Sequence, residues 1–229
     1  MMTMVDAGYA IELVRHHDQR ISTWSGGTTT EIAIYPPDAV YRRRDFLWRI
    51  SSARVDAETS TFTSLPSYRR LLMVLEGDMT LRHEGHHSAR LTPFQQDAFS
   101  GAWTTSSGGR ARDFNVMLAQ GCDGCLQADQ LAPGSSQVIS LDCPDADDDT
   151  RRGVRVIYAV DGAVMVTIGR EPLVSLGAGD ALLITVDRGR LLPRVVAQNG
   201  TSHGVHIVTA AIRYMDPGDT TTGYTARGA

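Results

Sequence analysis

The sequence RRLLMVLEGDMT, residues Arg69–Thr80, decides the fold. Its first half contains an unbroken apolar run, Leu71–Leu75, and Glu76-Gly77-Asp78 follows this run at once. A short apolar run that ends on acid-Gly-acid predicts a buried strand entering a hairpin turn, because glycine adopts a positive φ there without strain.

The same pattern recurs as RVIYAVDGAVMV at Arg155–Val166, where Gly162 takes the place of Gly77. A second acidic signal follows each copy: Gln96-Asp97-Ala98 after the first and Gly179-Asp180-Ala181 after the second. A strand-turn-strand unit followed at a similar distance by another strand start therefore occurs twice. This internal repeat predicts two tandem β-barrel-like units.

The rest of the chain also has the pattern of an all-β protein, since no stretch has a sustained helical period. Asn199-Gly200 is typical of a two-residue hairpin. We expect a first barrel at 1–120, an acidic and polar linker with one short strand at 121–153, a second barrel at 154–215 and a flexible tail at 216–229. The predicted strands outside the anchor stretch are Thr29–Tyr35, Phe46–Val55, Leu91–Phe99, Arg112–Leu118, Gln137–Leu141, Arg155–Val160, Ala163–Ile168, Ala181–Val186, Arg194–Gln198 and Gly204–Arg213.

Composition excludes several classes of partner. The formal net charge is −4, so charge gives no reason to expect nucleic acid or an anionic membrane surface as a partner. No signal peptide is visible, and no apolar run approaches the roughly 20 residues that span a bilayer. The cysteines are odd in number, and Cys122 and Cys125 are close together, which favours a reducing, cytoplasmic setting.

Four stretches in the first half carry a family resemblance. They are WSGGTTTEI (Trp24–Ile32), WRISSARV (Trp48–Val55), FTSLPSYRRLLMVL (Phe62–Leu75) and RDFNVM (Arg112–Met117). The repeated strand-Gly-turn units resemble the cupin superfamily, and two copies resemble a bicupin. The first half resembles the HutD/Ves family, bacterial bicupins linked to histidine utilisation. Ser25 and Ser67 stand where this family usually has Asn and Gly. The resemblance implies an all-β bicupin of two tandem jelly-roll-like barrels.

The resemblance also raises the question of a metal, because most chemically active cupins hold one with two His and a Glu. Counting back from the first turn glycine places Arg70 at the Glu position and Thr63–Pro66 at the His positions. In the second copy, Arg155 and Asp148–Arg151 fall at these positions. Neither copy offers an imidazole or thiolate ligand.

Other His and Cys residues gave no stronger indication of a metal. We interpret His83, His86 and His87 as a solvated hairpin, and Cys122-x-x-Cys125 is half of a zinc or redox motif without its other half. We therefore expect no metal and no cofactor.

Arg70 takes the metal ligand's place and should point into the barrel together with Leu72 and Val74. A guanidinium in an apolar cup needs an anion, because an unpaired buried charge is costly. The sequence leaves two alternatives open. The partner is an internal carboxylate of Glu31, Glu76 or Asp113, or it is a ligand carboxylate bound bidentately. The candidate ligand-binding residues are Trp24, Gly26, Gly27, Thr30, Glu31, Arg49, Ser51, Arg70, Asp113 and Asn115.

Two Arg residues and a few neutral donors in an apolar pocket favour a small carboxylate as ligand. The family resemblance implies a histidine-breakdown intermediate such as formylglutamate, urocanate or formate, and a binding protein that modulates the pathway. The alternatives are a metal-free isomerase or hydrolase with Glu31 or Asp113 as general base, and a purely structural protein whose second barrel is a dimerisation platform. Cupins often pair through sheet edges, so a homodimer is compatible with the sequence, which does not fix the oligomeric state.

Overall fold

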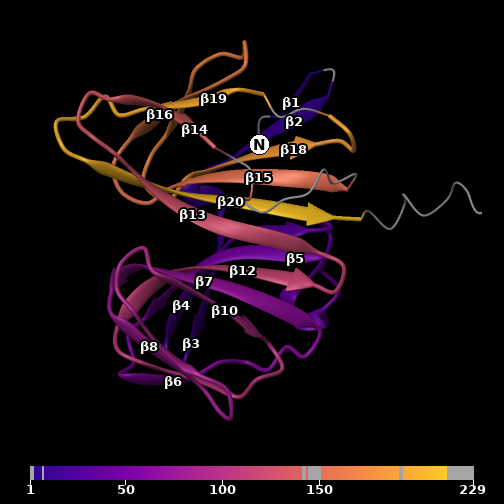
Figure 1. Ribbon diagram of the computed structural model, residues 1–229, viewed down its shortest axis with the longest axis vertical. Coiled ribbons are helices and arrows are strands. Elements are labelled where there is room, and N and C mark those ends of the chain that lie inside the picture. The colour runs from indigo at the N-terminus through magenta and orange to yellow at the C-terminus, as the bar shows by residue number, and fades with distance from the viewer. Residues whose placement is uncertain (1–2, 7, 141–142, 144–150, 191–192, 216–229) are drawn as a thin grey trace, which may run out of the picture.

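The computed structural model describes residues 3–6, 8–140, 143, 151–190 and 193–215, and it contains two stacked β-barrel units (Figure 1). Each unit pairs a six-stranded sheet with a four-stranded sheet, and the strands are antiparallel. The prediction of an all-β bicupin is confirmed. The tail at 216–229 and the acidic run at 144–150 lie outside the described residues.

The first unit is built from residues 20–119. Its large sheet has the order β10-β7-β12-β5-β4-β3 and its small sheet the order β6-β11-β8-β9. Two short 3₁₀ helices, η1 (His16–Asp18) and η2 (Tyr41–Arg43), lie in connections. The strands are β3 (Arg20–Trp24), β4 (Gly27–Tyr35), β5 (Trp48–Val55), β6 (Thr59–Thr61), β7 (Tyr68–Gly77), β8 (Met79–His83), β9 (Ser88–Leu91), β10 (Gln96–Ser100), β11 (Thr105–Gly108) and β12 (Ala111–Ala119).

The second unit has a large sheet of order β1-β2-β18-β15-β20-β13 and a small sheet of order β14-β19-β16-β17. Its strands are β1 (Thr3–Asp6), β2 (Tyr9–Val14), β13 (Asp123–Leu131), β14 (Ser136–Ile139), β15 (Arg152–Ala159), β16 (Val164–Ile168), β17 (Val174–Leu176), β18 (Ala181–Val186), β19 (Val195–Gln198) and β20 (Val205–Tyr214).

The topology reproduces the internal repeat. β10-β7-β12-β5 in the first large sheet corresponds to β18-β15-β20-β13 in the second, and the two small sheets correspond strand by strand. Gly77 ends β7 and Gly162 lies in the turn after β15, with φ values of 73° and 70°, as the acid-Gly signal predicts. Asp97 and Asp180 lie at the start of the strands that pair with β7 and β15.

The boundaries of the units differ from those expected. β2 pairs with β18, so the N-terminal strands complete the second unit, and Ile11 is buried in the second unit's core. The expected linker at 121–153 supplies β13 and β14 to the same unit. Local sequence shows that a strand forms but not which sheet edge it joins, and this explains both differences.

The large sheets pack face to face, and this contact explains the anchor sequence. Leu71, Met73 and Leu75 of β7 belong to the core between the two sheets. The alternate residues, Leu72 and Val74, point into the first barrel. A strand covered on both faces needs apolar residues at every position, and the run Leu71–Leu75 supplies them.

Two turn predictions differ from the structure. The predicted strand Leu91–Phe99 is split between β9 and β10 by a turn in which Phe94 has a φ of 67°. The predicted Asn199-Gly200 hairpin is wrong, because β19 and β20 lie in different sheets. The Asn199 side chain instead donates to the carbonyls of Leu131 and Ala132 at 3.0 and 3.2 Å, which anchors the connection.

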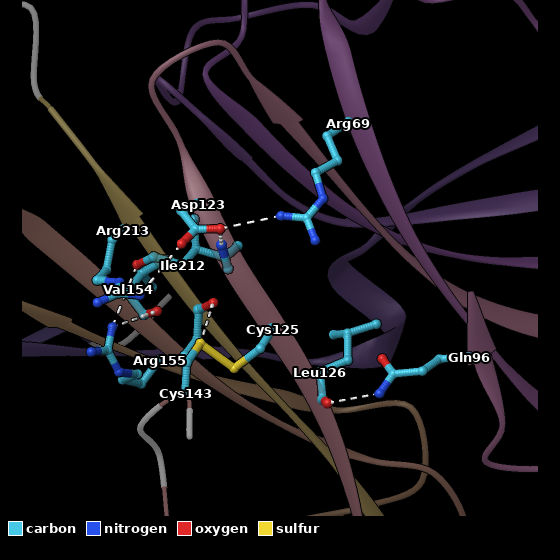
Figure 2. Close-up of a disulfide and its surroundings, with 12 residues drawn as sticks. Arg69, Gln96, Asp123, Cys125, Leu126, Cys143, Val154, Arg155, Ile212 and Arg213 are labelled. Atoms are coloured by element: carbon cyan, nitrogen blue, oxygen red, sulfur yellow. Dashed lines mark hydrogen bonds and ion pairs between the residues drawn. A yellow bond between two sulfur atoms is a disulfide. The ribbon is translucent and has the colours of Figure 1, made fainter. Parts of the chain in front are cut away.

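The cysteine pattern is also resolved differently. Cys125 on β13 forms a disulfide with Cys143 (Figure 2). Cys122 is free, and its thiol donates to the Leu47 carbonyl at 3.4 Å. Beside the disulfide, Asp123 lies between Arg69 of the first unit and Arg213 of the second, at 3.3 and 3.4 Å (Figure 2). Among the described residues, no helix has the length and apolar character needed to cross a membrane.

Candidate ligand-binding site

A cavity of about 400 Å³ opens into the first barrel between its large and small sheets. β4, β5, β7 and β12 of the large sheet supply one wall, and β6, β11 and η2 supply residues opposite. Most of the predicted site residues line this cavity, namely Trp24, Glu31, Arg49, Ser51, Arg70, Asp113 and Asn115.

Gly26, Gly27 and Thr30 do not belong to the lining residues. A side chain at Gly26 would overlap the Trp24 ring, and one at Gly27, whose φ is 155°, would overlap the Arg54 carbonyl. Both glycines therefore serve packing around the cavity wall. Thr30 lies between Thr29 and Glu31, which line the cavity, so strand alternation turns it to the other face.

Arg49 is engaged within the protein. Its Nε lies 2.7 Å from Glu31 Oε2, its Nη1 lies 3.0 Å from Ser51 Oγ, and its guanidinium carbon lies 4.5 Å from the centre of the Tyr41 ring. An ion pair with this geometry already neutralises both charges. Arg49 and Glu31 therefore form a fixed polar wall, and Arg49 is not the second free cation that the sequence suggested.

Arg70, in contrast to Arg49, contacts aromatic rings and no carboxylate of the described residues. Its guanidinium lies against the rings of both Phe62 and Phe99, with the guanidinium carbon 4.6 and 5.4 Å from the ring centres. The residue is 5% exposed, and its Nε is buried without a hydrogen-bond partner within the described part of the chain. Burial lowers the pKa of Arg70 to about 10, which still leaves it charged at neutral pH.

The internal carboxylates weighed as partners for Arg70 have other partners. Glu31 pairs with Arg49, and Glu76 pairs with Arg112, whose Nε lies 2.9 Å from Glu76 Oε1. Asp113 accepts a hydrogen bond from the Ala53 amide at 3.2 Å. None of these carboxylates forms an ion pair with Arg70.

Asp113 is nevertheless coupled to Arg70 through the cavity. Burial raises the pKa of Asp113 to about 7, against the opposing effects of the Arg70 charge and the Ala53 amide. Near neutral pH this carboxyl is therefore divided between its protonated and ionised forms. A buried carboxyl with such a pKa in a cavity is suited to proton transfer or to donating a hydrogen bond to an anion.

Neutral polar groups of the cavity are also unsatisfied. Asn115 Oδ1 and Ser107 Oγ are buried and lack a hydrogen-bond partner among the described residues. Ser107, Tyr41 and Phe62 were missed by sequence reasoning. Phe62 and Ser107 lie on or beside short strands of the small sheet. Only the fold reveals that this sheet faces the large one across the cavity, although Phe62 begins one of the resembling stretches.

One interpretation of the histidines is wrong. His83, taken as part of a solvated hairpin, is 3% exposed and packs 4.5 Å from the Phe99 ring, between ring centres. His86 and His87 are exposed. The small sheet buries the end of β8, because β11 pairs with it there.

A family model described as HutD matches residues 16–201. The chain belongs to the HutD family. A curated relative, an uncharacterised 21.2 kDa protein from the hutC 3′ region of Pseudomonas putida, is 36% identical over 115 residues. That match spans 48% of this chain and only 58% of the relative's length.

Solved structures agree with this assignment. A conserved protein of unknown function from Pseudomonas aeruginosa has a TM-score of 0.70 and 25% identity, over 88% of this chain and 98% of its own. HutD from Pseudomonas fluorescens, solved in a formate condition, has a TM-score of 0.59 and 24% identity, over 87% and 97%. An oxalate decarboxylase structure aligns with a TM-score of 0.60 at 8% identity, over 89% and 77%, which supports the cupin-like fold. The resemblance to HutD/Ves is thus confirmed.

Proposed function

We propose that the cavity of the first barrel binds a small carboxylate metabolite and that the protein thereby senses or sequesters an intermediate of histidine utilisation. The observation that carries this proposal is Arg70, a buried charged guanidinium that lines the cavity and has no ion pair with another described residue. Leaving such a charge unpaired costs several kcal/mol, and a bidentate carboxylate offsets that cost. Membership in the HutD family supports the link to histidine utilisation.

The other polar and apolar groups of the cavity limit which carboxylates fit it. Asn115 offers an unsatisfied carbonyl acceptor and Ser107 a hydroxyl in the same cavity, whereas Trp24 and Phe62 supply flat apolar walls. A volume of about 400 Å³ is at the lower end of ordinary small-molecule sites. It exceeds what formate fills, and this favours a ligand of the size of formylglutamate or urocanate.

A second carboxylate would have partners at the cavity mouth. Arg20 on β3 and Arg42 on η2 both line the cavity and are exposed. A dicarboxylate such as formylglutamate could therefore place one carboxylate on Arg70 and direct the other toward these side chains. Urocanate has one carboxylate, so comparing the two ligands tests the contribution of the rim.

The alternative function is a hydrolase or isomerase, and one observation favours it. Asp113 has a pKa of about 7 inside the cavity, which suits a general base at neutral pH. Glu31, the other candidate base, is already paired with Arg49 and is less suited to the role. Turnover of a bound carboxylate that disappears in Asp113→Asn, while binding persists, would establish the enzyme instead.

Thermal stabilisation tests the binding proposal with formylglutamate, urocanate, formate, glutamate and histidine as probes. A ligand at a hundred times its dissociation constant should add about 2.7 kcal/mol to the free energy of unfolding. We expect selective stabilisation by one carboxylate, lost in Arg70→Met and retained in Arg155→Met, which changes the corresponding position of the second unit. No stabilisation by any of these carboxylates would count against the proposal.

A further inference from the structure

Three metal-ligating side chains converge on one point outside the cavity. His83 Nε2 lies 3.0 Å from Asp97 Oδ2, and His87 Nε2 lies 3.1 and 3.0 Å from Asp97 Oδ1 and Oδ2. The three side chains come from the end of β8, the turn after it and β10, and their ligand atoms all lie within 4.8 Å of one another.

His83 is held with one nitrogen aimed at this point. Its side chain is fully buried, and its ring packs against Phe99 and Trp103 at 4.5 and 5.5 Å between ring centres. Nδ1 lies 2.8 Å from Thr105 Oγ1, so Nε2 is the nitrogen that faces Asp97. Fixing the ring through its other nitrogen is how proteins orient histidine ligands of metals.

The hydrogen bonds of His83 allow its Nε2 to bind a cation. The Thr105 hydroxyl has one hydrogen, and the Trp103 carbonyl lies 3.4 Å from its oxygen. When that hydrogen is donated to Trp103, His83 Nδ1–H donates to Thr105 and the Nε2 lone pair faces a carboxylate oxygen at 3.0 Å. In that arrangement a metal ion between Nε2 and the carboxylate satisfies both acceptors; without a metal the Thr105 hydroxyl donates to Nδ1 and Nε2–H donates to Asp97.

The second unit shows that the fold does not require this group. At the end of β16, which corresponds to β8, the cross-strand pair is Ile168 with Val195, and both are buried. The corresponding pair in the first unit is His83 with Thr105. Apolar packing therefore suffices to close a barrel at this place.

The position of Asp97 differs in the same way. Asp97 is the cross-strand partner of Leu72, and the corresponding pair in the second unit is Leu182 with Ile157, both fully buried. Asp97 instead faces two imidazoles, and the amide of Ala98 is its backbone donor. Comparison of the two units thus shows that the first unit has side chains able to bind a metal at positions where the second unit lacks them.

We propose that His83, His87 and Asp97 form a binding site for a divalent transition metal ion of the zinc type. Two imidazoles and one carboxylate are a donor set that suits Zn²⁺, Co²⁺, Ni²⁺ or Fe²⁺ rather than Mg²⁺ or Ca²⁺. Metal–ligand bonds of about 2.0–2.1 Å place neighbouring donors of a tetrahedral ion about 3.3 Å apart. The observed separations of 3.0 and 3.1 Å from the carboxylate oxygens are close to that spacing.

The site would keep one position for water or an outside ligand, because the His87 side chain is 43% exposed and the other two donors lie behind it. It is distinct from the carboxylate cavity, although the Phe99 ring contacts both His83 and Arg70. This proposal revises the expectation of no metal, which took His83, His86 and His87 as a solvated hairpin.

Titration of the metal-stripped protein with Zn²⁺, and with Co²⁺ as a spectroscopic probe, tests the site. We expect one equivalent of metal bound per chain and visible Co²⁺ absorption of a low-coordinate complex. His87→Ala and Asp97→Asn should abolish this binding, and Thr105→Val should weaken it about 10- to 100-fold, as removal of an outer partner does. His206→Ala, which removes a histidine paired with Asp161 in the second unit, is the matched control and should bind as the wild type does.

Two results would contradict the proposal of a metal site. One is a metal-stripped wild-type protein that binds neither Zn²⁺ nor Co²⁺ in this titration. The other is metal binding that His87→Ala leaves unchanged in a folded protein. His87 is exposed, so this variant keeps the test valid even where Asp97→Asn fails to fold.

Discussion

Replacing Asp113 by asparagine is expected to stabilise the protein at alkaline pH and to leave its stability near pH 4 unchanged. Asp113 is 2% exposed, and its pKa rises from the ordinary value of 3.8 to about 7 in the folded protein. Between these values the folded chain holds a proton that the unfolded chain has released. Wild-type stability therefore falls as the pH rises from about 4 to about 7.

The size of the effect follows from the same pKa values. A difference of about 3 pKa units corresponds to about 4 kcal/mol, since each unit is worth about 1.4 kcal/mol. Asparagine has the shape of aspartate, keeps the oxygen that accepts from the Ala53 amide and carries no charge. The free energy of unfolding of Asp113→Asn should thus exceed that of the wild type by about 4 kcal/mol above pH 7 and by nearly nothing below pH 4.

Urea denaturation at a series of pH values measures this difference, and the titration of other groups cancels between the two proteins. Asp45→Asn is the control of opposite sign. The Val40 amide and then the Arg43 charge, outweighing slight desolvation, lower the pKa of Asp45, so this variant should lose stability at neutral pH. A difference between Asp113→Asn and wild type that does not vary with pH, or that favours the wild type at pH 8, would refute the reasoning.

Three further predictions concern the cavity wall and the disulfide. Arg70→Met without ligand should unfold at the same or a higher free energy than the wild type in urea, because it removes an unpaired buried charge; a loss above 2 kcal/mol would mean that Arg70 has an internal partner. Gly26→Ala should displace the Trp24 ring and weaken carboxylate binding in calorimetry with little change in the far-UV spectrum; unchanged affinity would place Trp24 outside the site. Reduction of Cys125–Cys143, which closes a loop with a sequence separation of 18, should lower the free energy of unfolding by about 3 kcal/mol, and equal melting with and without reductant would contradict this.

The anchor strand shows how much of the fold was readable in the sequence. The unbroken run Leu71–Leu75 and the glycine after it predicted a buried strand entering a turn, and the structure adds that both faces of this strand are covered. The parity of Arg70 with Leu72 and Val74 predicted that Arg70 points into the barrel. These features depend on a few neighbouring residues. The repeat at Gly162 then extended the prediction to the second barrel.

Long-range pairing was not readable in the same way. β2 joins β18 across most of the chain, and Cys143 meets Cys125 only because β13 lies beside β20. For the same reason, the sequence did not show which charged residues pair inside the cavity. The sequence placed Arg49 and Glu31 in one pocket but did not show that they bind each other and leave Arg70 free.

The cluster of His83, His87 and Asp97 illustrates the limit most clearly. A polar hairpin read by itself is typical of a solvated loop, and only the pairing of β11 with β8 buries His83. The approach of β10 then adds the carboxylate. Each residue had an ordinary interpretation alone, and the site exists only in the folded chain.

Calorimetric titration with formylglutamate at neutral pH, on wild type, Arg70→Met and Arg155→Met, tests the central claim most directly. The account predicts one molecule bound per chain by the wild type and by Arg155→Met. It predicts a loss of at least about 30-fold in affinity for Arg70→Met, since truncating one partner of a buried charge pair costs about 2–5 kcal/mol. Equal affinity of a folded Arg70→Met, or no binding of this dicarboxylate by the wild type, would contradict it.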